Sequence, residues 1–490
     1  MEPGTADSLD ARSATPLVGE LLGRLDALIA QVVASERRLA ALGEQNSALI
    51  EQVAAQNAQI ASLLARIAEL EGRGGPRSAG APPKTPKNSS LPPSSVPKGN
   101  RGTAEKKPRK SRPGVARALA ENPDHVRDVY AEACPCGARL GEADQPDVFA
   151  YDHIDLPVIK PVTTRVRLHK GRCPCCRRRV TATPPADMPP GSPFGPGIVA
   201  TAVYLHASQM VSYERLVEML AGLFKLSVSE GAIANMLRRA GKRFEKPAAE
   251  IAEAVRNSPV VASDETSARV AGRTHWQWTF VAATAVSHVI VPSRGKAVPV
   301  EFLAGATPEV WISDRLAAQA GHGGRQQVCL AHLTRDAQYA IDAGDTIFAP
   351  AFKAFLQEAC AVGRKRPELD DRQLAAEKTR MTAELDRLMK LEAKEKNGRH
   401  LQAAIFLDAT DKLLVFLDRR DVEPTNNESE RTLRPSVVFR KVTGCFRSAW
   451  GAKVYADIRS IVATGLKRGR NALASIREAL AGNSPLAPAA

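Results

Sequence analysis

Apolar residues between Leu25 and Leu70 alternate at spacings of three and four, which constrains this segment to a helix with one continuous apolar stripe. The a positions are Leu25, Val32, Leu39, Asn46, Val53, Ile60 and Ile67, and the d positions are Leu28, Ser35, Leu42, Leu49, Gln56, Leu63 and Leu70. β-Branched residues at a and Leu at d favour a parallel two-stranded coil, and Asn46 at an a position fixes the dimer register. We expect a coiled coil over residues 16–72 that makes the protein a homodimer or a higher oligomer. The alternative is one amphipathic helix packed on its own domain.

Residues 73–113 are rich in Pro, Ser, Gly and Lys, a composition too poor in apolar residues to fold by itself. They hold eleven Lys or Arg and one acid, Glu105, in a chain whose net charge is +15. We predict a basic disordered linker in which Lys106, Lys107, Arg109 and Lys110 neutralise DNA phosphates. The alternative is a solvated tether.

Five of the eight cysteines lie between Cys134 and Cys176, which favours metal binding over a disulfide framework. The pairs predict a structural Zn²⁺ site made by Cys134, Cys136, Cys173 and Cys176, in a zinc-ribbon-like DNA-binding module at 114–190 with strands between 148 and 168. The first pair is one residue shorter than C-x-x-C, so Cys175 or His169 could replace Cys136, or the site could be an ordinary hairpin.

Residues 191–255 read as three helices, at 198–209, 213–223 and 229–244, with Ser229 capping the third. The third helix carries Arg238 and Arg239, which makes the module similar to a helix-turn-helix DNA reader. A helical spacer that packs on the next domain fits the pattern nearly as well.

A mixed α/β domain is predicted over residues 256–470, with a helical insertion at about 345–420 and a C-terminal helix and tail at 471–490. Its strand-like runs are 259–263, 276–280, 286–291 and 309–313, with a helix at 297–304 before the last. Asp264 follows the first run and Asp314 follows the fourth. Because ligands gather at strand ends in such sheets, we expect the two carboxylates to meet.

Glu430 is the third acid that we assign to this site. Thr425 to Glu428 reads as a capping box that starts a helix after Pro424, which leaves Glu430 inside the helix. Three converging carboxylates suit two Mg²⁺ ions, which would clamp the attacking and leaving oxygens of a phosphodiester. The alternative for Glu430 is a surface ion pair with Arg434.

Further polar residues surround these acids in the sequence. Cys329 and His332 have the spacing of metal ligands, but two ligands alone do not make a metal site. We therefore assign them a structural or orienting role, and we give Asn426 and Asn427 the same role. Beyond Glu430, a basic path could carry DNA phosphates; it includes Arg434, Arg440 and Lys441.

Taken in order, these segments resemble the transposases of insertion-sequence family sixty-six over nearly the whole chain. The resemblance rests on the zipper, the Lys87–Ser95 linker sequence, the cysteine pairs, Asp264-Glu265-Thr266, Cys329-x-x-His332 and Asn426-Asn427-x-x-Glu430-Arg431. It implies a ribonuclease-H-like core with an Asp264, Asp314 and Glu430 triad. In that topology the first and fourth strands are neighbours.

The resemblance implies an enzyme that binds the inverted repeats of an insertion sequence, cuts the double-stranded DNA ends and joins the 3′ hydroxyls to target DNA, with possible accessory proteins from the same element. The alternatives are a DNA-binding regulator or inactivated transposase, and a ribonuclease-H-like nuclease that cuts without joining. No run is long enough to span a membrane and the start lacks a signal peptide, so we expect a cytoplasmic, nucleoid-associated protein.

Overall fold

The computed structural model describes residues 117–487, residues 82–89 and part of the N-terminal region (25, 28, 30–40, 42, 43, 45 and 52). The chain divides into two compact units, Met1–Ala81 and Pro82–Ala490. Every described residue of the first unit is helical, and its apolar side chains at heptad positions are exposed: Leu25, Leu28, Val32, Leu39 and Leu42. Asn46, Lys106, Lys107, Arg109 and Lys110 lie outside the described residues.

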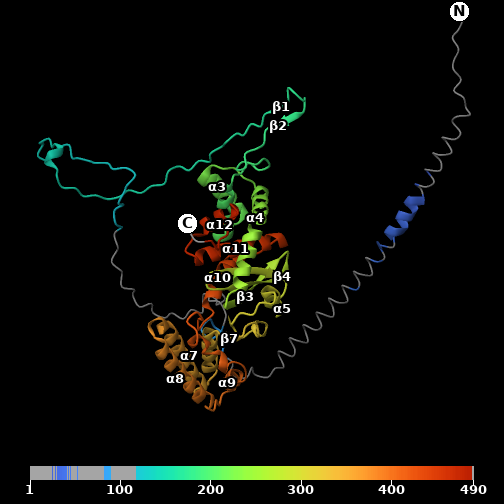
Figure 1. Ribbon diagram of the computed structural model, residues 1–490, viewed down its shortest axis with the longest axis vertical. Helices are drawn as coiled ribbons and strands as arrows, with labels where there is room; N and C mark the ends of the chain where they lie inside the picture. Colours follow the sequence, from blue (N-terminus) through green and yellow to red (C-terminus); the bar gives the residue numbers. More distant parts are fainter. Residues whose placement is uncertain are drawn as a thin grey trace, which may run out of the picture. The chain divides into compact units, whose positions relative to one another are not determined.

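A five-stranded mixed sheet organises the second unit (Figure 1). Its strands are β3 (Val260–Val270), β4 (Arg273–Val281), β5 (Val286–Val291), β6 (Val310–Ser313) and β7 (Arg325–Val328), and their spatial order is β5-β4-β3-β6-β7. The first three strands are antiparallel, whereas β6 runs parallel to β3 and to β7. This confirms the predicted order of three strands, a helix (α5, Ala297–Leu303) and a fourth strand beside the first.

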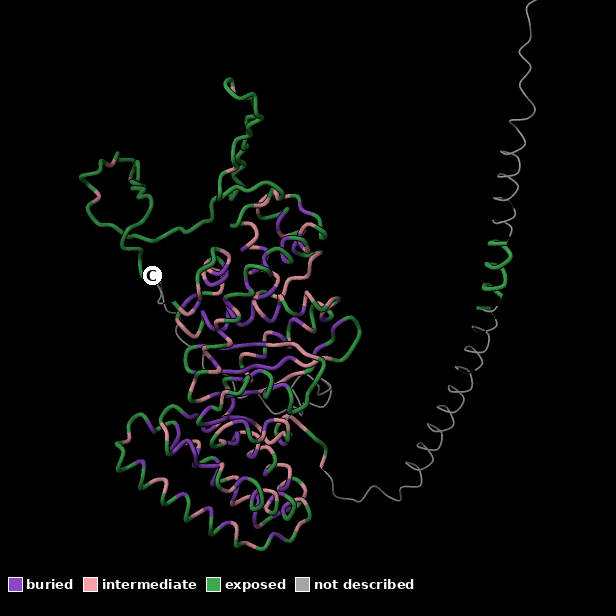
Figure 2. Tube along the Cα trace, turned by 45° about the vertical axis from the view of Figure 1, so that its right-hand side comes forward, coloured by how far each residue is buried: buried purple, intermediate pink, exposed green. Residues whose placement is uncertain are grey.

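The strands are buried on both faces of the sheet (Figure 2). On one face Trp278, Phe280 and Trp311 pack with α5, whose Phe302 ring stacks on Phe280 at 3.7 Å between centroids. On the other face Ala262 and Ile312 pack against α6 (Leu330–Asp342) and α7 (Phe348–Lys365). This second face also carries the polar side chains of the site.

The free edge of β5 is covered by α11 (Ala449–Lys467). Ser460 accepts a hydrogen bond from the His288 backbone N–H, and Thr464 accepts one from Val286 N–H. An open sheet edge exposes unpaired backbone groups, and these two hydroxyls satisfy two of the N–H groups without another strand.

Helices before and after the sheet share one core with it. They are α2 (Pro196–Val203, continued by a π-helical turn at Tyr204–Ser208), α3 (Tyr213–Phe224), α4 (Glu230–Arg256), α11 and α12 (Ala472–Leu480). Ser229 caps α4 as predicted, with its hydroxyl accepting from Ala232 N–H at 3.2 Å. The helix runs twelve residues past the predicted end at Phe244, because Ile251 and Val255 continue its apolar stripe into the core.

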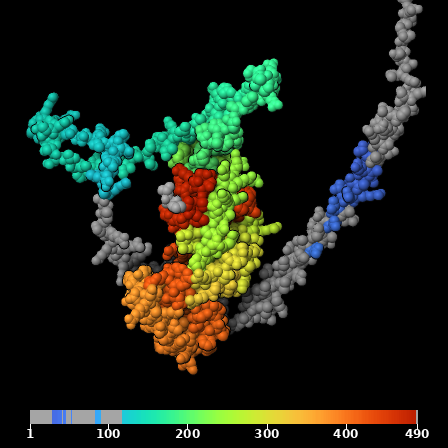
Figure 3. Space-filling model, in the orientation of Figure 1, coloured from blue at the N-terminus to red at the C-terminus, as the bar shows by residue number. Residues whose placement is uncertain are grey.

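The predicted helical insertion consists of α7, α8 (Asp371–Met389) and α9 (Lys396–Asp408), and Figure 3 shows it as a close-packed mass in orange. It leads into α10 (Asn427–Thr443). Short 3₁₀ turns join these parts. The 3₁₀ turns of the described residues are Glu142–Asp144, Ala317–Gln319, Arg366–Glu368, Thr410–Lys412 and Val415–Leu417.

Residues 117–190 contain one two-stranded hairpin, β1 (Lys170–Arg172) with β2 (Arg179–Thr181). The prediction of strands between 148 and 168 is wrong, since these residues have no regular structure here and side chains such as Phe149 and Val162 are exposed. Their alternating pattern finds no ladder partner among the described residues, and a strand needs one.

None of the helices described is both long enough and apolar enough to cross a lipid bilayer.

Candidate active site

Parallel pairing of β3 with β6 brings two of the predicted acids together. The last paired residues are Ala262 and Ile312, and Asp264 and Asp314 lie two residues further along on the same face. Asp264 does not end its strand, as its apolar run had suggested, because β3 continues to Val270 in its pairing with β4.

Asp264 is half-buried and lies in a strongly acidic environment. Its burial and the charges of Glu265, Asp314 and Glu430 raise its pKa to about 8, against a weaker opposing effect of the Glu265 N–H that it accepts at 2.9 Å. Burial is the largest cause of this high pKa, and the neighbouring carboxylates add to it.

Glu430 lies in the first turn of α10, near enough for its charge to raise the pKa of Asp264. The predicted capping box is wrong, because α10 starts one position later with Asn426 as its N-cap residue, and Asn426 makes no side-chain cap. The buried Asn426 amide donates instead to Ser263 O at 2.6 Å, and its backbone N–H donates to Cys329 Sγ at 3.1 Å. Asn426 thus ties the start of α10 to β3 and to the start of α6.

Glu430 lies near cations from α6. Its Oε1 atom is 3.7 Å from His332 Nε2 and 3.9 Å from Arg335 Nη1, whereas no ion pair joins it to Arg434. Burial lowers the pKa of His332, but Cys329 and the charge of Glu430 outweigh that effect and raise it to about 9. His332 is therefore a cation at neutral pH beside Glu430.

A pair of threonines also positions α10. Thr279 faces Asp264 across the β3–β4 ladder, and its hydroxyl lies 3.1 Å from that of Thr432, two residues after Glu430. Thr432 donates its own proton to Ser429 O at 2.8 Å, so Thr279 is the donor in the pair. Asn427, by contrast, is half-buried at the first position of α10.

Glu265 is a polar residue whose importance the sequence did not reveal. Its side chain is 1 % exposed and accepts hydrogen bonds from Arg294 at 2.8 Å and from Gln319 at 2.8 Å. Arg294 also stacks over the Trp276 ring at 4.5 Å. Because strand residues alternate, Glu265 points away from Asp264, and it joins the loops after β5 and β6.

The family model described as "Transposase IS66 family" matches residues 191–454, more than half of the chain and a span that includes all three acids. This chain belongs to the IS66 family of transposases. A search of curated proteins found no match. The mixed sheet and its surrounding helices fit the DDE-type catalytic core of the family.

Transposases of this DDE type generally use divalent metal ions. Among the described residues of this IS66-family chain, no three His, Cys, Asp or Glu side chains are close enough to hold one ion. The donor set nevertheless suits a hard cation, since Asp264 has a raised pKa among other carboxylates and Glu430 Oε1 is buried without a hydrogen-bond donor.

The predicted DNA-contacting residues within the described part of the transposase occupy two helices. Arg434 and Lys441 are exposed on α10, while Arg440 on the same helix donates to the Ser267 hydroxyl at 2.8 Å. On α4, Arg238 lies 5.7 Å from the Trp450 ring centroid and Arg239 donates to Gly191 O at 3.1 Å.

The two cysteine pairs of the transposase form equivalent turns. Cys134 N–H donates to Ala138 O and Gly137 N–H to Cys134 O; in the second turn Cys173 N–H donates to Arg178 O and Arg177 N–H to Cys173 O. The first turn is therefore the second with one residue removed. Gly137 and Arg177 both have positive φ, at 92° and 59°.

Hydrogen bonds within each turn favour thiolates. Backbone N–H groups and the facing thiol lower the pKa of Cys136, which faces Cys134, and the pKa of Cys173, which faces Cys176. The structure thus brings the cysteines together as two pairs, and the two pairs do not meet among the described residues.

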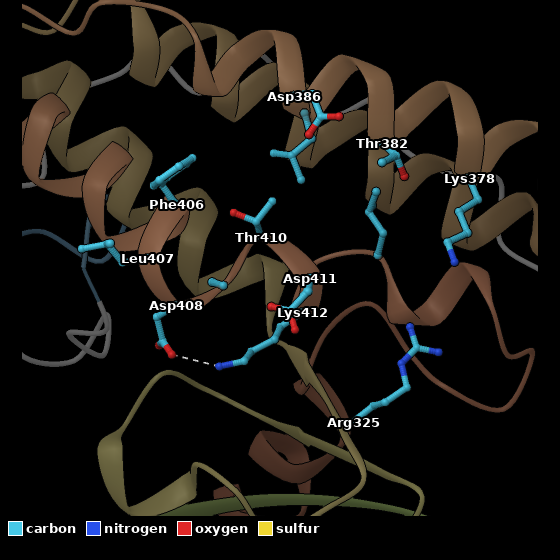
Figure 4. Close-up of a pocket in the computed structure, with 13 residues that line it drawn as sticks. Arg325, Lys378, Thr382, Asp386, Phe406, Leu407, Asp408, Thr410, Asp411 and Lys412 are labelled. Carbon is cyan, nitrogen blue, oxygen red and sulfur yellow. Dashed lines mark hydrogen bonds and ion pairs between the residues drawn. The ribbon is translucent and has the colours of Figure 1, made fainter.

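A cavity of about 660 Å³ is lined by residues of the helical insertion and by Arg325 of β7 (Figure 4). Its wall includes Lys378 and Phe406, and Lys412 pairs with Asp408 at 2.9 Å beside it. Lys378 pairs with Asp418, and no residue of the acidic site lines the cavity.

Proposed function

We propose that this protein binds the terminal inverted repeats of an insertion sequence, cleaves the ends and joins the 3′ hydroxyls to target DNA. The observation that supports the proposal is that Asp314 and Glu430 are both near enough to raise the pKa of Asp264 by their charge, and that all three acids lie inside the matched family region. Phosphoryl transfer between DNA strands needs little besides alignment and charge stabilisation, and carboxylates on β3 and directly after the adjacent strand β6 suit that role.

The three acids would hold two Mg²⁺ ions. When bound, these ions would supply the positive charge that stabilises the attacking and leaving oxygens of an in-line displacement. The protein's own contribution is to place the carboxylates. β3 and β6 fix Asp264 and Asp314, while Asn426 and the Thr279–Thr432 pair fix the turn that carries Glu430.

Protons in the site are held at defined atoms. The raised pKa of Asp264, about 8, favours its protonated form at neutral pH, and bound cations would favour the carboxylate. The protonated His332 and Arg335 lie beside Glu430 and would neutralise a phosphate that approaches from α6. Glu265 holds the two loops next to Asp314 without being a ligand.

DNA would be held outside this pocket by basic residues of the core and the N-terminal modules. Arg434, Arg440 and Lys441 would contact phosphates beside the site, and Arg238 and Arg239 would contact them from α4. The linker cations Lys106, Lys107, Arg109 and Lys110 would add affinity that falls with salt. A Zn²⁺ ion bound by Cys134, Cys136, Cys173 and Cys176 would bring the two cysteine turns together.

The N-terminal heptads would pair two protomers as a coiled coil, so that one assembly holds both ends of an element. We expect the protein to act on chromosomal and plasmid DNA in the cytoplasm, with accessory proteins of the same element where these are required.

The test is a gel assay with purified protein, labelled DNA ends, a target plasmid and Mg²⁺. We expect nicked ends and joined products from the wild type, and binding without either product from Asp264→Asn and Asp314→Asn. Binding without nicking by the wild type would favour a regulator or an inactivated enzyme. Nicking without joining would favour a nuclease.

A further inference from the structure

Residues 82–89, within the segment whose composition predicts a disordered linker, fold into a turn on the second compact unit. Asn88 is the centre of the turn and is only 3 % exposed. Its Oδ1 atom accepts from Thr85 N–H at 2.6 Å, and Nδ2 donates to Pro83 O at 3.1 Å. The prediction of disorder is therefore wrong for these eight residues, because the buried Asn88 amide bonds two of their backbone groups and Thr85 O accepts from Asn88 N–H and from the Ser89 hydroxyl.

Asn88 also makes a hydrogen bond outside the turn. Its Nδ2 atom donates the second N–H to Asp342 Oδ2, at the end of α6, over 2.8 Å. Since an asparagine side chain has two donor protons and one oxygen, all of its hydrogen-bonding capacity except one lone pair is used here. Neither aspartate, which lacks the donors, nor a longer glutamine can make the same three contacts.

The Asp342 carboxylate, which accepts this hydrogen bond, is also held in place. Gln338 donates to the other oxygen of Asp342 at 2.7 Å, and Lys353 from α7 donates to Gln338. The network thus runs from α7 through α6 to the turn, and it orients the Asp342 carboxylate toward Asn88. A chance contact between a linker and a surface needs no such support from a second helix.

We propose that residues 82–89 are an anchor that docks the linker on the α6–α7 surface of the catalytic unit, recognised through the Asn88–Asp342 contact. Docking divides the linker and leaves only residues 73–81 between the end of the predicted coiled coil and the anchor. A shorter free chain raises the effective concentration of the tethered parts. The anchor also contacts the helix whose first turn carries His332.

Trypsin digestion of the full-length protein tests the anchor without any use of activity. Lys84 and Lys87 are exposed, so cleavage after them depends on how often the turn opens. Asn88→Asp keeps the size of the side chain but removes both donors and places a second carboxylate at Asp342. We expect cleavage at Lys84 and Lys87 to rise about tenfold or more in this variant.

Two further variants make the result specific. Adding Asp342→Asn to Asn88→Asp restores a donor–acceptor pair across the contact, so the double variant should regain part of the protection from trypsin. The control variant Asn100→Asp, in the same linker, should be cleaved at the wild-type rate. Unchanged cleavage in Asn88→Asp would overturn the proposal. So would equal cleavage in the single and double variants while the thermal unfolding midpoint stays constant.

Discussion

Thr279 and Thr432 show how single hydroxyls position a catalytic turn. Their contact is the one side-chain link described between β4 and the turn of α10 that carries Glu430. The Thr279 hydroxyl has a matching acceptor only while Thr432 keeps its oxygen, and valine preserves the shape of the side chain without it.

We expect Thr432→Val to lower the rate of DNA cleavage about tenfold to a hundredfold at unchanged DNA affinity, because small displacements of a catalytic group are costly. Single-turnover rates and gel-shift affinities would be measured together. Thr443→Val is the matched control, since Thr443 lies on the same helix and donates only to Phe439 O within it. Equal rates for both variants would argue against a positioning role.

His288 on β5 pairs with Thr279 on β4, and its side chain is buried. Burial and the nearby charge of Arg459 on α11 hold its pKa well below the usual value of 6.5. As the pH falls, His288 therefore takes up a proton in the unfolded chain before it does so in the folded protein. The free energy of unfolding then falls below about pH 6.5, by at most about 1.4 kcal/mol per pH unit.

We expect His288→Asn to unfold with a shallower loss of stability between pH 7 and 5 than the wild type, whatever its stability at pH 7. Denaturant titrations at several pH values would measure the slope. His275→Asn, on the neighbouring strand and partly exposed, should keep the wild-type slope. A wild-type slope in His288→Asn would show that this ring does not take part.

At the scale of elements, the paired cysteine turns carry a prediction about metal content. The first turn reproduces the second with one residue fewer, and each turn presents two facing thiols. We expect the purified protein to contain one Zn²⁺ per chain and Cys134→Ser or Cys173→Ser to lose it, since a structural site needs four ligands. Cys175→Ser should keep the ion. Loss of zinc in Cys175→Ser with retention in Cys136→Ser would reassign the fourth ligand.

The sheet could be predicted because its strands are local patterns. Runs of β-branched and aromatic residues gave four strands and the helix between them, whereas the pairing of the first with the fourth was implied by the family resemblance. The strand β7 escaped prediction, since Arg325-Gln326-Gln327-Val328 is mostly polar and is recognisable only from its pairing with β6.

The start of α10 could not be predicted from local sequence. Thr425 to Glu428 has the spacing of a capping box, yet the Asn426 amide binds Ser263 O, 163 positions earlier in the chain. The same applies to Glu430, whose cationic neighbours come from α6 rather than from the next helical turn. Interactions between distant segments determine both features, and a local pattern does not contain them.

At the scale of the whole molecule, the predicted coiled coil would bury heptad residues that are exposed in the described part of the N-terminal unit. Leu28 and Leu42 are 56 % and 57 % exposed. We expect Leu28→Glu with Leu42→Glu to convert a dimer into a monomer in sedimentation experiments, because charge at d positions opposes the coiled coil. Arg37→Glu, at an outward f position, should stay dimeric. A dimer that survives the double substitution would place the interface elsewhere.

Whether Glu430 completes a catalytic triad is tested most directly by strand transfer with two matched variants. Glu428→Gln changes the same residue type two positions away, where the side chain is exposed and pairs with Lys467. We expect Glu430→Gln to form joined DNA products at least about a hundredfold more slowly than the wild type, while Glu428→Gln stays close to it. Full joining by Glu430→Gln, with loss in Glu428→Gln, would contradict the triad and the placement of α10 in this account.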